Sequence, residues 1–243
     1  MSGTLYGLGL GPGDPELVTL KAARILRQAP VIAYPLAEGT PSFARAIAAP
    51  HLPGGQSEIA IGLCMADARE PARAAYDRAA FEIAAHLGAG RDVAALCEGD
   101  PFFYGSFMYL FERLAADFAV EIVPGVSSLA ATAAAARRPL AARNDTVVVI
   151  PAPLPDATIA ARIEGATSFA IMKLGRHFAR VKALLAELRL IDACIYVERA
   201  SLPEERILPL AETGNDAPYF AMILGYRGAE PAMQVPRRKA AFA

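Results

Sequence analysis

The sequence has few of the residues that mark several common classes of protein. It contains no tryptophan and only three cysteines and three histidines in 243 residues. The cysteines, Cys64, Cys97 and Cys194, form no C-x-x-C pair, which argues against a disulfide framework or a zinc site. The histidines lack the spacing of metal ligands or of a catalytic triad. We therefore expect buried, reduced thiols and no bound metal.

The sequence also lacks a charge excess and a long apolar run. Its formal net charge is -1, and the basic residues are spread along the chain apart from a short run at 237–239, which argues against nucleic-acid binding. No window approaches the apolar length of a membrane span, and the first residues lack the basic region of a signal peptide. We expect a soluble, cytoplasmic protein that binds neither nucleic acid nor membrane.

Short β-rich runs alternate with helical stretches over most of the chain, and this alternation predicts an α/β protein. At 54% hydrophobic residues, the chain is long enough for a large core. The pattern restarts after an alanine-rich helix, which predicts two α/β domains, 1–124 and 125–243. The predicted strands are 4–10, 30–35, 92–97, 120–123, 146–152, 168–174, 193–198, 205–210 and 219–226, and the predicted helices are 15–28, 41–50, 69–87, 109–118, 127–138 and 177–189.

The first turn, "YGLGLGPGDPEL", has glycine at every second position from Gly7 to Gly13. A dinucleotide fingerprint does not fit, because Pro12 and Asp14 stand where its two registers need the last glycine. A phosphate loop would need a lysine where Asp14 stands. The pattern instead predicts a strand, a tight turn and Asp14 as a helix N-cap. An uncharged or cationic ligand could lie against this bare backbone; a plain strand-to-helix turn is the alternative.

Five turn-rich segments each follow a predicted strand. In open α/β sheets, ligands bind outside the carboxyl ends of strands, so we expect these segments to converge on one site. Taken singly, their residues have simpler explanations, such as an Asx turn at Asp100, a core position at Met172 or a helix cap at Ser127 and Ser128. The segments are 9–15, 98–106, 124–128, 173–176 and 199–203.

Five motifs carry a resemblance to a known family. From about Thr4 to Gly225, "GLGLGPGDPELVTLKA", "CEGDPFFYGS", "VPGVSS", "IMKLG" and "VERAS" occur in the order seen in the tetrapyrrole methylases. The resemblance implies two α/β domains with the cofactor and substrate cleft between them, S-adenosyl-L-methionine (SAM) as cofactor, S-adenosyl-L-homocysteine as product, and a homodimer. SAM carries a sulfonium cation and no phosphate, which agrees with the missing phosphate-binding lysine.

The resemblance also implies site residues. Its cofactor-binding positions fall on Pro12, Glu98, Gly99, Asp100, Phe103, Ser127, Ser128, Met172 and Ala200, although the family often has glycine where Ala200 stands. No signature identifies a general base, and location alone suggests the catalytic candidates Asp100, Glu98, Tyr104 and Tyr34. The carboxylate arms of a tetrapyrrole need basic partners, for which the candidates are Arg24, Arg45, Arg137, Arg138, Lys173 and Arg176.

Within the family, "VIAYPLAEG" and "EGDPFFYGSFMYLFERL" look like the branch that methylates precorrin-2 at C20, giving precorrin-3A in cobalamin biosynthesis. Three alternatives stay open: a different corrin or uroporphyrinogen carbon, the RNA or diphthamide substrates of distant branches, and a non-catalytic SAM- or tetrapyrrole-binding protein. If ligand passes close to Gly11, Gly11→Val should weaken binding more than folding, provided that Gly11 does not have a positive φ.

Overall fold

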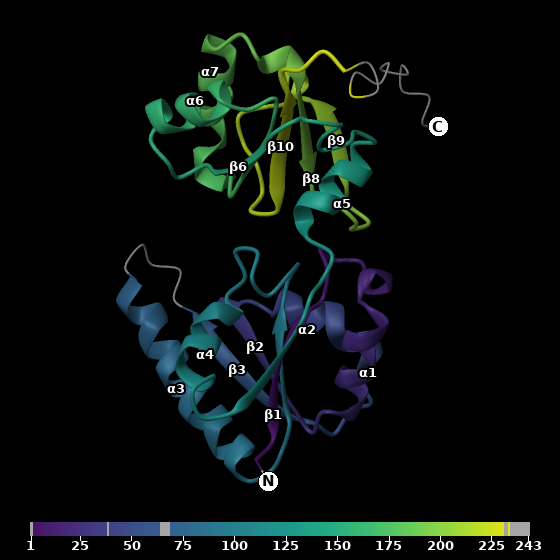
Figure 1. Ribbon diagram of the computed structural model, residues 1–243, viewed down its shortest axis with the longest axis vertical. Helices are drawn as coiled ribbons and strands as arrows, with labels where there is room; N and C mark the ends of the chain where they lie inside the picture. Colours follow the sequence, from purple (N-terminus) through teal and green to yellow (C-terminus); the bar gives the residue numbers. More distant parts are fainter. Residues whose placement is uncertain (1, 38, 64–68, 231–232, 234–243) are drawn as a thin grey trace. The chain divides into compact units, whose positions relative to one another are not determined.

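The computed structural model describes residues 2–37, 39–63, 69–230 and 233. It divides into two compact units, Met1–Ser128 and Leu129–Ala243, and each unit has one five-stranded sheet. The predicted α/β fold with two sheets is therefore confirmed (Figure 1). The predicted boundary falls after residue 124. Within the described residues, no helix has both the length and the apolar character that crossing a membrane requires.

The sheet of the first unit is parallel throughout, in the order β3-β2-β4-β1-β5. Helices α1 and α2 lie on one side of it and α3 and α4 on the other (Figure 1). The elements are β1 (Thr4–Gly9), α1 (Leu20–Gln28), β2 (Val31–Ala37), α2 (Phe43–Ala48), β3 (Ser57–Leu63), α3 (Arg69–Gly88), β4 (Val93–Cys97), α4 (Phe107–Leu114) and β5 (Ala119–Val123).

Strand β4 shows why this sheet needs helices on both faces. Every residue of "VAALC" is buried. Val93, Ala95 and Cys97 pack into the cluster formed with α3 and α4, whereas Ala94 and Leu96 pack into the cluster formed with α1 and α2. Successive side chains of a strand point to opposite faces, so a strand that is covered on both sides is apolar at every position.

The first predicted helix, 15–28, is two separate helices in the structure. A short 3-10 helix spans Pro15–Leu17, and α1 begins only at Leu20. Each has its own cap: the Asp14 carboxylate accepts from the N–H of Glu16 at 2.9 Å, and the Thr19 hydroxyl accepts from the N–H of Ala22 at 3.2 Å. The predicted N-cap role of Asp14 is therefore confirmed, but for the shorter helix. The extended conformation of Thr19 separates the two helices.

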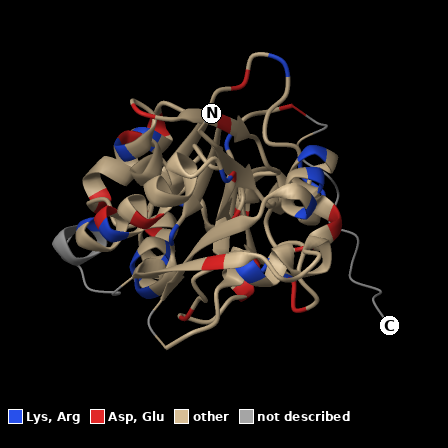
Figure 2. Ribbon diagram, turned by 90° about the horizontal axis from the view of Figure 1, so that it is seen from below, with Lys and Arg blue, Asp and Glu red and all other residues tan. Residues whose placement is uncertain are grey.

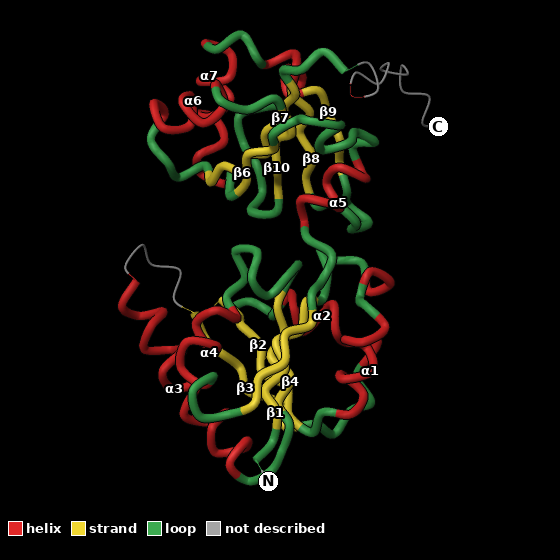
Figure 3. Tube along the Cα trace, viewed as in Figure 1, coloured by secondary structure: helices red, strands yellow, loops and turns green. Residues whose placement is uncertain are grey.

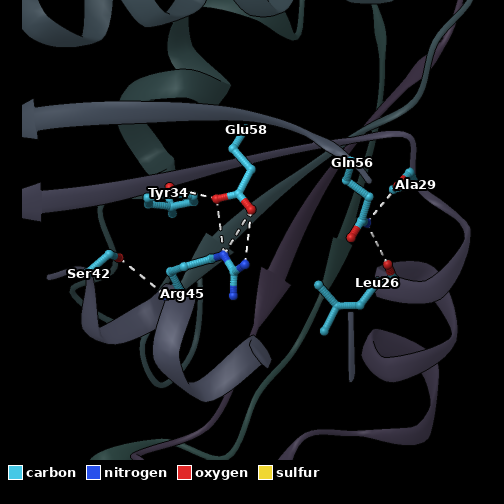
Figure 4. Close-up of polar contacts among 7 residues, drawn as sticks. All are labelled: Leu26, Ala29, Tyr34, Ser42, Arg45, Gln56 and Glu58. Carbon is cyan, nitrogen blue, oxygen red and sulfur yellow. Dashed lines mark hydrogen bonds and ion pairs between the residues drawn. The ribbon is translucent and has the colours of Figure 1, made fainter. Parts of the chain in front are cut away.

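Strand β3 was missed by the sequence prediction, which left its residues in a loop. Among the described strands it is an edge strand whose one partner is β2, and it buries Ile59 and Ile61 while Glu58 stays exposed. The Gln56 side chain anchors its start by donating to two carbonyl oxygens at the end of α1, at 2.9 and 2.8 Å (Figure 4). The alternation of buried and exposed residues in β3 is short. It directly follows a Pro- and Gly-rich stretch, and for this reason the segment was interpreted as a loop.

The sheet of the second unit is mixed, in the order β6-β7-β10-β8-β9, with β10 antiparallel to both of its neighbours. Helices α6 and α7 cover one face and α5 the other (Figure 3). Helix α6 was also missed by the prediction. The elements are α5 (Ser128–Ala135), β6 (Val147–Pro151), α6 (Asp156–Glu164), β7 (Ser168–Met172), α7 (Phe178–Glu187), β8 (Cys194–Glu198), β9 (Arg206–Pro209) and β10 (Ala221–Tyr226).

Candidate functional site

The topology of the first sheet indicates where a ligand would bind. Strands β1 and β4 are neighbours, yet β1 leads to α1 on one face and β4 leads to α4 on the other. Where connections leave neighbouring parallel strands toward opposite faces, a crevice opens at the carboxyl ends of those strands. The loops there are 10–19 after β1, 98–106 after β4 and, on the other side of β1, 124–127 after β5.

These three loops touch through their glycine backbones. The N–H of Gly11 donates to the carbonyl of Gly99 at 3.2 Å, and the N–H of Gly99 donates back to Gly11 at 2.7 Å. A Cβ on Gly9 would lie 2.8 Å from the Gly99 oxygen, and a Cβ on Gly125 would lie 2.7 Å from the Gly9 Cα. Side chains would force the loops apart, so the bareness of this region is required by contacts between loops.

Gly11 also adopts a backbone conformation that favours glycine. Its φ is +80°, and an added Cβ would lie 3.2 Å from the Leu17 carbonyl oxygen. A β-branched residue reaches such a φ only with strain. The condition attached to the Gly11→Val experiment is therefore not met, because the substitution would disturb the fold as well as any ligand.

Asp100 ties two of the loops together. Its Oδ1 accepts from the N–H groups of Phe102 at 2.9 Å and Phe103 at 3.1 Å, which forms the Asx turn. Its Oδ2 accepts from the N–H of Gly125, in the loop after β5, at 3.1 Å. With three backbone donors engaged, the Asp100 carboxylate is placed to hold the loops in position.

Glu98 is the half-buried carboxyl at the end of β4. Burial raises the pKa of Glu98, because the charged form loses water, while the N–H groups of Glu98 itself and of Ala44 lower it in part. Ala44 lies in the first turn of α2. A carboxyl group with a raised pKa next to a ligand loop is a good candidate for proton transfer.

The two tyrosine candidates have different surroundings. Tyr104 is 43% exposed, has a φ of +58°, and its ring meets Phe103 edge to face at 5.3 Å. Tyr34 lies on β2 and donates to Glu58 at 2.7 Å, and Arg45 binds the same carboxylate (Figure 4). Burial and this hydrogen bond to Glu58 raise the pKa of Tyr34, which disfavours it as a base.

The structure brings most of the predicted cofactor residues together in the first unit. The backbone nitrogen of Ser128 lies 3.9 Å from the position of a Cβ on Gly99, which places the start of α5 beside the loop after β4. Met172 and Ala200 belong to the second unit. The residues carried by the three loops and the start of α5 are Pro12, Glu98, Gly99, Asp100, Phe103, Ser127 and Ser128.

In the second unit, strained backbone follows two strand ends. Met172, the half-buried last residue of β7, is followed by Lys173 with a φ of +60°. Ala200 follows β8 and lies between Arg199 at +52° and Ser201 at +71°. Left-handed conformations of non-glycine residues persist only where the surrounding structure imposes them, and they gather at functional sites.

Glu198, the last residue of β8, fixes the end of this strand through hydrogen bonds. Its buried carboxylate accepts from the Tyr196 hydroxyl at 2.6 Å and from Arg206 of β9 at 3.0 Å. Burial raises the pKa of Tyr196, which keeps this donor protonated. The N–H of Arg199 then donates to the Phe220 carbonyl at 2.8 Å, so the strained segment is held on both sides.

The sequence analysis missed two aromatic residues at the edge of the second sheet where β7 and β8 end. Tyr219 and Phe220 are 65% and 41% exposed, and their rings meet edge to face at 5.0 Å. They precede β10, which is antiparallel to β7 and β8, so its beginning lies where those strands end. The sequence analysis expected ligand contacts only in segments that follow strands, whereas these two residues precede one. Two adjacent aromatic residues at the start of an apolar strand were the available sign of an exposed apolar surface.

The basic candidates divide into structural and exposed groups. Arg45 is bound by Glu58, whereas Arg138 donates to the Ala193 carbonyl at 2.9 Å and lies over the Tyr226 ring. Basic and acidic residues are interspersed over the ribbon (Figure 2). Within the described ranges, no group of three or more His, Cys, Asp or Glu side chains is arranged to hold a metal ion. The exposed candidates are Arg24, Arg137, Lys173 and Arg176.

Two α/β units with glycine-rich or strained loops at strand ends define the class of α/β proteins in which ligands generally bind outside the carboxyl ends of the strands. Residues 4–213 match the tetrapyrrole (corrin/porphyrin) methylases, and the chain belongs to this family.

Several relatives match most of this chain. It is 37% identical to a precorrin-2 C(20)-methyltransferase of Sinorhizobium sp, covering 91% of this chain and 94% of the relative, and 36% identical to a cobalt-precorrin-2 C(20)-methyltransferase of Salmonella typhimurium, covering 92% and 96%. It spans only 46% of the cobalamin biosynthesis protein CobIJ of Mycobacterium tuberculosis, at 42% identity. Uroporphyrin-III C-methyltransferase from Thermus thermophilus, solved with S-adenyl homocysteine, has a TM-score of 0.65 and 29% identity, covering 92% of this chain and 97% of that one.

Proposed function

We propose that this chain is a SAM-dependent methyltransferase that methylates precorrin-2 at C20, giving precorrin-3A in cobalamin biosynthesis. The observation that carries the proposal is the identity of 36–37% with two relatives named for this C20 methylation, over more than 90% of each protein. The alternative is another tetrapyrrole methylase activity on a different corrin or uroporphyrinogen carbon.

SAM as the cofactor is supported by the family and by the chemistry of the first unit. The likeness to a methyltransferase solved with S-adenyl homocysteine points to this class of ligand. The loops after β1, β4 and β5 present backbone groups and the carboxylates of Glu98 and Asp100, and a lysine for phosphate is missing where a phosphate loop needs one. Nearby carboxylates would stabilise the positive charge of the sulfonium group. SAM would supply an activated methyl group. The residues proposed to bind it are the predicted Pro12, Glu98, Gly99, Asp100, Phe103, Ser127, Ser128, Met172 and Ala200.

Positioning would account for most of the catalysis, because a sulfonium leaving group needs no acid catalyst. Asp100 would hold the loops rather than take a proton, since its oxygens already bind three backbone N–H groups. After methylation, the carbon acceptor loses a proton. We assign Glu98 as the candidate base, because burial raises its pKa toward the range where a carboxylate accepts protons effectively.

The second unit would contribute to binding of the acceptor. Precorrin-2 is a conjugated macrocycle with carboxylate arms, so it needs apolar surface and cations. The exposed rings of Tyr219 and Phe220 supply the first, and Lys173 and Arg199, both exposed after strand ends, supply the second.

The test is a methylation assay with purified protein and SAM, using precorrin-2, cobalt-precorrin-2 and uroporphyrinogen III in parallel. The expected result is a mass gain of one methyl group on a precorrin-2 acceptor, at C20 by NMR, and none on uroporphyrinogen III. Methylation of uroporphyrinogen III alone would support the alternative activity. Tight binding of SAM and tetrapyrrole without turnover would indicate a carrier or sensor and contradict the enzyme proposal.

We also propose a cytoplasmic homodimer. The buried free thiols of Cys97 and Cys194 suit a reducing compartment; Cys64 lies outside the described residues. On α4 and the loop before it, the side chains of Phe102, Met108 and Phe111 are 36–47% exposed and offer an apolar face for a second copy. Light scattering should give twice the monomer mass, and Phe111→Glu should lower it.

A further inference from the structure

The loop between β8 and β9, residues 199–205, contains two residues in left-handed conformations. The φ of Arg199 is +52° and that of Ser201 is +71°, and Ala200 lies between them. This conformation suits glycine, but it costs free energy for a residue with a side chain, because Cβ approaches the following carbonyl oxygen. Since neither position holds glycine, contacts with the rest of the structure must maintain both conformations.

The base of this loop is closed by Glu198 and Arg206. The two residues are paired in the antiparallel register of β8 and β9, and the Arg206 guanidinium donates to the Glu198 carboxylate at 3.0 Å. Glu198 is 6% exposed and also accepts from the Tyr196 hydroxyl at 2.6 Å. A buried carboxylate needs such donors, and these bonds fix the strand end from which the loop starts.

Two further hydrogen bonds hold the left-handed residues themselves. The N–H of Arg199 donates to the Phe220 carbonyl at 2.8 Å, just before β10. The N–H of Ser201 donates to Oε2 of the Glu205 carboxylate, also at 2.8 Å. A hydrogen bond from a backbone N–H to a carboxylate is stronger than one to a neutral acceptor. Because Glu205 directly precedes Arg206, the start of β9 holds both the base of the loop and its turn.

We propose that Glu205 is a positioning residue whose carboxylate, through the Ser201 N–H, holds residues 199–201 in the conformation that presents Ala200 to the cofactor. The inference rests on the proposed function, because Ala200 is one of the proposed SAM-binding residues. A turn that is fixed before binding loses little conformational freedom when the ligand binds, which favours affinity. The hydrogen bonds around the turn therefore maintain a strained conformation that the loop would not keep by itself.

Glu205→Ala and Glu205→Gln in the full chain test the inference by calorimetry with S-adenosylhomocysteine and by thermal unfolding. Alanine removes the acceptor of the Ser201 N–H, so we expect the dissociation constant to rise by about tenfold, with little change in the unfolding midpoint. Glutamine keeps an oxygen that can accept this bond, and its dissociation constant should stay within about threefold of wild type. Equal losses of affinity in the two variants would overturn the inference, because the hydrogen bond would not be what matters.

Glu204→Ala is the matched control. It removes an exposed carboxylate one residue away and should leave both the affinity and the unfolding midpoint unchanged. The same loss of affinity in Glu204→Ala as in Glu205→Ala would show an effect of net charge and would overturn the inference.

Ser201→Gly separates the conformation of the turn from other roles of Glu205. Glycine adopts a φ of +71° without strain, so the single variant should bind normally and have an equal or higher unfolding midpoint. In the Glu205→Ala background, Ser201→Gly should restore part of the lost affinity, because the turn then needs less support. A double variant that binds no better than Glu205→Ala would overturn the inference.

The failure of this inference can be distinguished from the failure of the proposed function. Wild-type protein that does not bind S-adenosylhomocysteine would overturn the proposed function itself. Normal wild-type binding together with normal affinity in Glu205→Ala would overturn only the role of Glu205. If Glu205→Ala does not fold, Glu205→Leu takes its place, since it keeps much of the side-chain volume but cannot accept the hydrogen bond. Normal affinity in that variant overturns the inference as well.

Discussion

The carboxylate of Asp100 accepts a hydrogen bond from the backbone N–H of Gly125, 3.1 Å from Oδ2, and so joins the loop after β4 to the loop after β5. Oδ1 of the same carboxylate holds the turn of its own loop. One side chain thereby fixes the relative positions of two segments that are 25 residues apart in the sequence.

Asp100→Asn should separate this role from that of a catalytic base. The amide can keep the Oδ1 bonds, but its NH₂ group would face the N–H of Gly125 and leave that donor unsatisfied. We expect a loss of about 1–3 kcal/mol in the free energy of unfolding, with weaker cofactor binding. Urea unfolding and calorimetry measure the two effects. A variant that keeps full stability and affinity but loses turnover would instead identify Asp100 as the base.

Gly125→Ala tests the contact between the glycine backbones. Its Cβ would lie 2.7 Å from the Gly9 Cα, so the loops must separate, and we expect destabilisation of about 1–3 kcal/mol together with loss of cofactor affinity. Gly62→Ala on β3 is the matched control, because its Cβ would meet nothing within 4 Å. Equal stability of the two variants in urea would contradict the close packing described for these loops.

Glu98→Gln should change how stability depends on pH. Burial raises the pKa of Glu98, so wild-type protein loses stability as pH rises from the ordinary carboxyl range through this raised pKa. The variant lacks this loss; its unfolding midpoint should exceed that of wild type at pH 8, and the difference should shrink toward pH 4. Turnover should fall if Glu98 is the base.

Glu58→Gln provides a control of opposite sign. Hydrogen bonds from Arg45, and then from Tyr34, lower the pKa of Glu58, so its stabilising contribution is present above the ordinary carboxyl range and disappears as pH falls through the lowered pKa. The variant should therefore be less stable than wild type at pH 8. The same pH trend in both variants would show that the environment assigned to Glu98 is wrong.

Binding of the acceptor should depend on salt more than binding of SAM. Precorrin-2 carries several carboxylates, whereas the net charge of SAM is small. Salt therefore screens the attraction between the acceptor and basic side chains more than it affects the binding of SAM. We expect about a tenfold rise in the dissociation constant of the acceptor between about 0.05 M and about 0.5 M salt. Lys173→Gln should reduce this salt dependence, and Arg162→Gln, an exposed charge at the end of α6, should not. Equal salt dependence for both ligands would contradict the predicted basic acceptor site.

Local patterns predicted most of the elements, and the ends of many strands and helices lie close to the predicted ones. The apolar run of β4 and the capping role of Asp14 were both recognisable, because burial on two faces and helix capping leave local signatures. Strand β3 was missed because an edge strand needs only two buried positions, and α6 because its buried Ile159 and Ile163 give a short periodic signal.

The sequence by itself determined the family, the α/β class and the loops that follow the strands, because these depend on ordered motifs and on the periodicity of side chains. Only the tertiary structure decided what those loops do to one another. Gly9 and Gly125 must be bare because they meet where the neighbouring strands β1 and β5 end, and Tyr219 reaches the edge of the second sheet because β10 runs antiparallel to its neighbours. Contacts between distant segments depend on strand order and direction, which a local pattern of residues does not encode.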